Sequence, residues 1–78
     1  MTHNYWADSD QYIFRLPEGA SIYGPAEAFR YDTLTWAPCG RISNEIGRGE
    51  VDKVTGAEAD RICDLIRARA VTENAAAS

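Results

Sequence analysis

The sequence has few of the side chains that most often carry catalysis or bind metals. Its 78 residues include one histidine and two cysteines. His3 lies near the amino terminus, whereas a general base must be held at a fixed distance from its substrate. The cysteines are far apart in the chain, so no zinc-ligand spacing is present. We therefore expect no enzymatic activity, no metal and no cofactor.

Long apolar runs and an export signal are also lacking. The longest apolar stretch is only a few residues, whereas a helix that spans a bilayer needs about 20. The first 20 residues contain no basic region followed by an apolar one, as a secretory signal would. We expect a cytoplasmic protein.

The two cysteines fit a reducing compartment. Cys63 falls on the apolar stripe of an expected helix, where a free thiol acts as a small hydrophobic group. Cys39 lies in a Pro38-Cys39-Gly40 turn. The alternative is a disulfide between them, which would stabilise the fold by about 3 kcal/mol in an oxidising compartment.

Local patterns for phosphate or cation binding are incomplete. Gly47-Arg48-Gly49 lacks the length and the lysine of a phosphate-binding loop. Acidic pairs occur at Asp8 with Asp10 and at Glu50 with Asp52, but the twelve-residue calcium loop is absent. We interpret these segments as turns and solvated surface.

Negative charge is in excess, and it is unevenly distributed. Residues 1–40 hold five carboxylates against two bases, a balance of −3, and residues 41–78 hold seven against six, a balance of −1. The arginines after residue 40 are interleaved with carboxylates. Because phosphate contacts need a clear positive surplus, we expect no direct binding of nucleic acid. The acidic half favours a cationic partner.

Alternation of apolar and polar residues predicts strands in the first half of the chain. After a loose arm over residues 1–7, a strand is expected over residues 10–16, with Tyr12, Phe14 and Leu16 on one face. A short strand over 20–23 follows the Pro17-Glu18-Gly19 turn, and another covers 29–33. Residues 34–36 either continue it or form a separate strand. Between residues 41 and 54, a short helix near Ser43 and a strand or extended lead-in over 51–54 are expected.

The end of the chain predicts one helix. Thr55 and Glu58 have the spacing of a capping box. An apolar stripe follows at helical spacing, formed by Ala59, Ile62, Cys63, Ile66 and Ala70. Residues 72–78 have small side chains and are expected to fray. The elements together predict one α+β domain over residues 1–78, in which this helix covers the aromatic face of a small antiparallel sheet. One extra short helix fits the same arrangement.

After these exclusions, the acidic half of the chain favours a surface that binds another protein. In the acidic half, carboxylates alternate with aromatic residues, which suit an interface as anchors and steering charges. The expected partner-binding residues are Asp8, Asp10, Glu18, Glu27 and Asp32. The alternative interpretation places the aromatic residues in the core and leaves the carboxylates as a solubilising surface.

In its size, acidity, low cysteine content and α+β pattern, the whole chain resembles the small acidic inhibitors of phages and mobile elements, and in particular anti-CRISPR proteins. No shared motif carries this resemblance. It implies a non-enzymatic inhibitor in the bacterial cytoplasm that binds a CRISPR surveillance complex. The five carboxylates would act as a DNA mimic on the basic surface that binds target DNA.

Two other functions fit the sequence. One is a small phage accessory or assembly protein that acts as a homo-oligomer through an edge strand or the terminal helix, although we expect a monomer rather than a dimer. The other is a nucleic-acid regulator that uses the arginines after residue 40.

Overall fold

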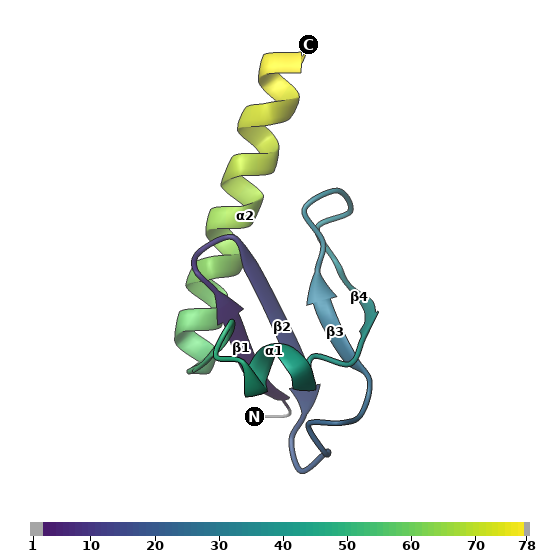
Figure 1. Cartoon of the computed structure of the whole chain (residues 1–78). Coiled ribbons are helices and arrows are strands. Elements are labelled where there is room, and N and C mark those ends of the chain that lie inside the picture. Colours follow the sequence, from purple (N-terminus) through teal and green to yellow (C-terminus); the bar gives the residue numbers. More distant parts are fainter. Residues whose placement is uncertain (1–2, 78) are drawn as a thin grey trace.

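A five-stranded antiparallel sheet with strand order β4-β3-β2-β1-β5 forms the centre of the protein (Figure 1). The computed structural model describes residues 3–77, and the side chains of residues 3–72. The elements are β1 (His3–Asp8), β2 (Tyr12–Pro17), β3 (Ala26–Phe29), β4 (Trp36–Gly40), α1 (Ser43–Gly47), β5 (Asp52–Val54) and α2 (Gly56–Ala77). The α+β class, the C-terminal helix and the extra short helix are as predicted.

The first strand is the main departure from the sequence expectation. Residues 3–7 belong to β1, which lies between β2 and β5, so the predicted loose arm is wrong for these residues. Trp6 and Ala7 are only 7% and 5% exposed. They point to opposite faces of the sheet, because successive strand residues alternate, and each enters a different core cluster. Residues 1 and 2 lie outside the described residues.

The connections between strands also differ from the prediction. Residues 20–23 form no strand, because the segment closes two tight turns. Ala20 donates its N–H to the Pro17 carbonyl at 3.0 Å, and Gly24 donates to the Ser21 carbonyl at 3.0 Å. Strand β3 ends at Phe29, so residues 30–33 of the strand predicted over 29–33 form a loop instead. The next strand, β4, continues through Pro38 to Gly40.

Both faces of the sheet are covered, and α2 covers the face opposite to the one predicted. Helix α2 contacts β1 and β2 and packs on Ile13 rather than on Phe14 and Leu16. The buried residues of this side, named the helix-side core here, are Ala7, Ile13, Phe29, Ala59, Ile62, Cys63 and Ile66. The other face buries Trp6, Leu16, Ala26, Ile42 and Val51, with Phe14 and Ile46 packed against them. Because β2 is buried on both faces, its pattern could not show which face α2 takes.

Helix α2 forms as its sequence predicts. The backbone N–H of Glu58 donates to the Thr55 hydroxyl oxygen at 3.1 Å, which satisfies one of the free donors at a helix start. The Glu58 side chain binds Arg61 instead of completing the capping box. All five residues of the predicted stripe are buried. The helix continues to Ala77, past the sheet (Figure 1), where fraying was expected from residue 72; Ser78 lies outside the described residues.

Candidate protein-binding site

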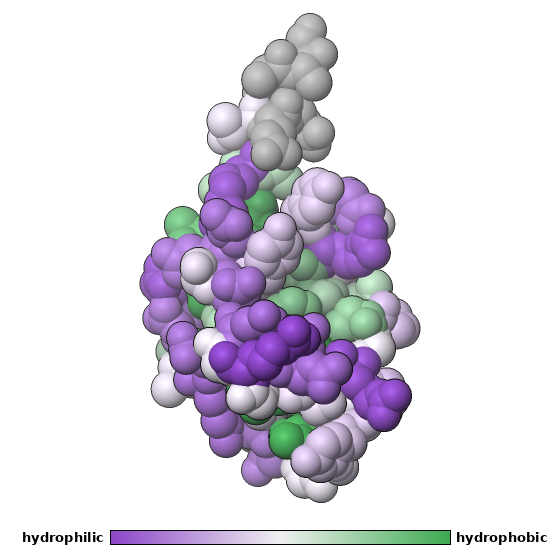
Figure 2. Space-filling model, in the orientation of Figure 1, coloured by the Kyte–Doolittle hydropathy of each residue, from purple (hydrophilic) through white to green (hydrophobic). Residues whose placement is uncertain are grey.

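The β1–β2 turn and the β3–β4 loop lie at the same end of the sheet (Figure 1), and residues of both line a pocket. Its volume is about 250 Å³, and we call it the tyrosine pocket. Its lining residues are Gln11, Tyr12, Tyr31, Ile66, Arg69 and Ala70. The walls therefore come from two separate hairpins, and the floor comes from α2. In Figure 2, apolar atoms show between α2 and the β3–β4 loop, where the surrounding surface is hydrophilic.

The two tyrosines of the pocket are its most exposed aromatic groups. Tyr12 is 53% exposed and Tyr31 is 65% exposed, whereas Ile66 and Ala70 beneath them are buried. Tyr12 begins β2, and Tyr31 lies two residues beyond the end of β3. An exposed tyrosine offers a large, rigid contact area with a polar tip, as in the anchors of protein interfaces. The arrangement suits contact with another protein.

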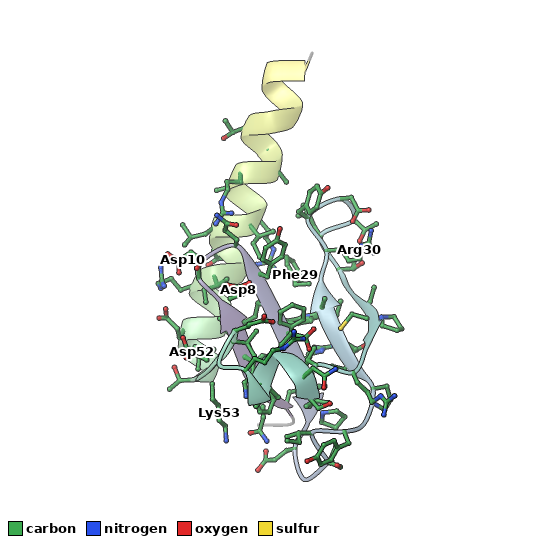
Figure 3. The ribbon with its side chains drawn as sticks, viewed as in Figure 1. Asp8, Asp10, Phe29, Arg30, Asp52 and Lys53 are labelled. Atoms are coloured by element: carbon green, nitrogen blue, oxygen red, sulfur yellow. The ribbon has the colours of Figure 1, made fainter. Side chains whose placement is uncertain are left out.

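Three of the five predicted carboxylates lie at this end of the sheet. Asp8 ends β1 opposite Tyr12, and Asp10 lies in the turn between them. Figure 3 shows Asp8 and Asp10 beside this turn and Arg30 at the β3–β4 loop. Asp32 belongs to the same loop, next to Tyr31. The other two are elsewhere: Glu18 lies in the β2–β3 loop at the opposite end, and Glu27 lies within β3.

Arginines of the chain bind three of the predicted carboxylates. Glu27 accepts from Arg15 Nε at 2.8 Å, Asp32 accepts from Arg30 Nη2 at 3.0 Å, and Asp10 accepts from Arg61 Nη2 at 2.9 Å. The hydrogen bond from Arg30 holds the pKa of Asp32 below its usual value. In the part of the chain with described side chains, Asp8 and Glu18 form no ion pair. The five carboxylates therefore do not form one continuous anionic row.

Charge around the pocket nearly balances. Three carboxylates (Asp8, Asp10 and Asp32) and three guanidinium groups (Arg30, Arg61 and Arg69) lie there, and two ion pairs form between them, Arg30 with Asp32 and Arg61 with Asp10. These ion pairs are half-exposed, and such pairs typically contribute only about 0–1 kcal/mol to stability. We therefore expect the tyrosines, rather than net charge, to supply most of the binding energy at this end.

Two arginines of α2 hold the β1–β2 turn against the helix. Arg61 donates to both Glu58 and Asp10, and these hydrogen bonds raise the pKa of Arg61 further. Arg69, which lines the pocket beside Ala70, donates to the backbone carbonyl of Asp10. The turn that leads into Tyr12 is thus tied to α2 at two points.

The sequence predicted an acidic and aromatic surface in the first half of the chain but not this pocket. Tyr12 and Tyr31 were both placed on strands that could bury them, and Arg69 was counted only among the arginines after residue 40. Gln11 carried no signal. Only the pairing of the strands and the packing of α2 on the sheet bring these residues together, because Tyr31 is 19 positions from Tyr12 and Arg69 is 58 positions from Gln11.

A second pocket, of about 420 Å³, lies where β1, β5 and the start of α2 meet. Its lining includes His3, Tyr5 and Lys53. His3 is part of β1, with its ring centroid 6.3 Å from that of Tyr5, so the expectation of an unfixed terminal histidine is wrong. The second pocket carries no exposed aromatic pair, and we therefore favour the tyrosine pocket as the binding site.

Other chemistry finds little support in the described residues. Among them, no three His, Cys, Asp or Glu side chains lie close enough to hold a metal ion. None of the helices within residues 3–77 is long and apolar enough to cross a membrane. Both cysteines are free, with Cys39 exposed and Cys63 buried, and burial raises the pKa of each thiol.

No protein-family model, curated protein or solved structure matches the chain.

Proposed function

We propose that this protein is a non-enzymatic inhibitor that binds a folded protein partner through the tyrosine pocket. The observation that supports this is the position of two tyrosines, each more than half exposed, on separate hairpins at either side of a buried apolar floor. Interfaces draw most of their energy from a few such aromatic anchors surrounded by polar groups.

A CRISPR surveillance complex in the bacterial cytoplasm is the partner class we propose. The resemblance in size, acidity and fold class supports this choice. The inhibitor would cover the surface that binds target DNA by contact through Tyr12 and Tyr31, with Asp8 as the unpaired acidic group beside them. A phosphate-like row of charges is not part of this proposal, because Glu18 lies at the far end and Glu27 is bound to Arg15.

The test measures the affinity of a purified surveillance complex for wild-type protein and for three alanine variants. Tyr12→Ala and Tyr31→Ala are each expected to lose about 2 kcal/mol, or about 30-fold in affinity, as anchors do. Tyr23→Ala is the matched control, because Tyr23 is 67% exposed but lies in the β2–β3 loop at the opposite end. An equal loss in all three variants, or no loss at either pocket tyrosine, would contradict the proposal.

The edges of the sheet favour a monomer over strand-mediated assembly. Edge strand β4 contains Pro38, which has no N–H to donate, and its pairing with β3 is interrupted at Ala26 and Glu27. The opposite edge, β5, has only three residues and carries Asp52 and Lys53. Short, charged or proline-containing edges resist pairing with a second sheet. Light scattering is expected to give the mass of one chain, and a stable dimer at low concentration would favour the assembly function instead.

A further inference from the structure

The β3–β4 loop, residues 30–35, is closed by its own hydrogen bonds. The N–H of Arg30 donates to the Thr35 carbonyl at 2.9 Å, and the N–H of Leu34 donates to the Arg30 carbonyl at 2.8 Å. The hydroxyl groups of Thr33 and Thr35 lie 2.9 Å apart and share a hydrogen bond. Tyr31 lies inside this closed loop and is 65% exposed.

Leu34 adopts a backbone conformation that leucine rarely takes. Its φ is +57°, in the left-handed region where a side chain with a Cβ is disfavoured and glycine is not. Its side chain packs against the helix-side core. The contact of the Leu34 side chain with the core holds its backbone in this disfavoured conformation, and the loop is thereby fixed in one conformation.

Asp32 directs both of its carboxylate oxygens into the loop. Oδ1 accepts from the backbone N–H of Thr33 at 2.9 Å and from Arg30 Nε at 3.0 Å, and Oδ2 accepts from Arg30 Nη2 at 3.0 Å. This carboxylate therefore has its hydrogen-bonding capacity largely filled before any partner arrives. Asp8, by contrast, forms none of the ion pairs or side-chain hydrogen bonds seen among the described side chains.

We propose that Asp32 and Leu34 are positioning residues, which hold the loop in its binding conformation in the free protein so that Tyr31 is presented to the partner. This inference rests on the proposed function, because it assigns roles within the same site. It changes the role of Asp32 from a charge that contacts a basic partner to a group that acts through Tyr31. A loop ordered before binding loses less conformational freedom on association, which favours affinity.

The first test needs no partner. Hydrogen exchange of the backbone amides at positions 30 and 34, which donate the two hydrogen bonds that close the loop, reports by NMR whether the loop opens. Asp32→Ala and Leu34→Gly are each expected to speed this exchange at least about tenfold, while core amides of β2 stay protected. Asp32→Asn keeps an oxygen that accepts from Thr33, so its exchange is expected to stay within about threefold of wild type. Slow exchange in both Asp32→Ala and Leu34→Gly would overturn the inference.

The second test separates positioning from direct contact by charge. With the surveillance complex, Asp32→Ala is expected to weaken binding about tenfold, and Asp32→Asn only up to about threefold with an unchanged salt dependence. If Asp32 acts through Tyr31, the Tyr31→Ala, Asp32→Ala double variant binds no more weakly than Tyr31→Ala alone. Additive losses, or an Asp32→Asn variant as weak as Asp32→Ala, would overturn the positioning role. If wild-type protein binds no surveillance complex but the amide exchange rates of the variants follow the expected order, the proposed function is wrong. The conclusion that Asp32 and Leu34 order the loop is then still supported.

Discussion

Truncation of Ile62 is the perturbation that most directly tests how α2 is attached to the sheet. Ile62 is 1% exposed and belongs to the helix-side core with Ile13, which is also 1% exposed. Replacing a buried isoleucine by alanine typically costs about 2–5 kcal/mol, and by valine about 0.5–1.5 kcal/mol. A 78-residue domain is expected to unfold with a free energy of about 4–12 kcal/mol. Ile62→Ala should therefore remove a large fraction of the total stability.

Urea unfolding followed by tryptophan fluorescence measures this loss, because Trp6 and Trp36 lie in or beside the two core clusters. Val71→Ala is the matched control on the same helix. Val71 is 63% exposed, and such surface changes usually stay within about 0.5 kcal/mol. The expected order of destabilisation is Ile62→Ala, then Ile62→Val, then Val71→Ala. A loss below about 1 kcal/mol in Ile62→Ala would refute the packing of α2 described above.

Three further predictions concern charge, acid and thiols. Asp8→Lys is expected to weaken association with the surveillance complex about three- to tenfold, mainly through a slower association rate. Glu18→Lys, at the opposite end of the sheet, is expected to leave the affinity unchanged. Surface plasmon resonance measures both variants, and equal effects would contradict the assignment of the binding site to the end that carries Asp8. The pKa of Asp32 in the folded protein lies below its unfolded value of about 3.9. Its contribution to stability is therefore present above about pH 4 and is lost as the pH falls through the folded pKa. Urea unfolding between about pH 2 and 5 should show a loss of stability with acid that is smaller in Asp32→Asn. A thiol reagent at moderately alkaline pH should modify Cys39 in the folded protein and Cys63 only after unfolding, and equally fast modification of both would contradict the burial of Cys63.

The helix was predictable because its signals are local. The stripe from Ala59 to Ala70 and the Thr55 cap are set by spacing within one segment, and all of them appear in the structure. The turn at Pro17-Glu18-Gly19 was predicted, but the strand predicted over residues 20–23 was wrong although the turn signals around it are also local. Gly19 at φ +84° and the Gly24-Pro25 pair fit turns, and they outweighed the strand tendency of Ile22 and Tyr23.

The position of β1 could not be read from the sequence. His3, Asn4 and Asp8 make the segment polar, and its burial depends on pairing with β2 and with β5, which follows more than 40 residues later. The face covered by α2 was mistaken for a related reason, because Ile13 and Leu16, on opposite sides of β2, are both 1% exposed. Alternation alone does not distinguish the two cores of a sheet that is buried on both faces.

The candidate site, too, could be predicted from the sequence only in part. Composition predicted an acidic and aromatic surface, and three carboxylates do lie near the tyrosine pocket. Whether Asp10 is available to a partner depends on an arginine distant in sequence, Arg61, which is 51 positions away. The exposure of Tyr12 and Tyr31 depends on where β2 begins and β3 ends. These are tertiary properties that no local pattern specifies.

Competition with DNA tests the central claim most directly. A surveillance complex is titrated with wild-type protein and, in parallel, with the Tyr12→Ala, Tyr31→Ala double variant, and the fraction of target DNA bound is measured at each concentration. We expect saturating wild-type protein to abolish DNA binding and the double variant to leave it almost intact at the same concentration. Undiminished DNA binding with wild-type protein, or equal inhibition by the double variant, would contradict binding through the tyrosine pocket.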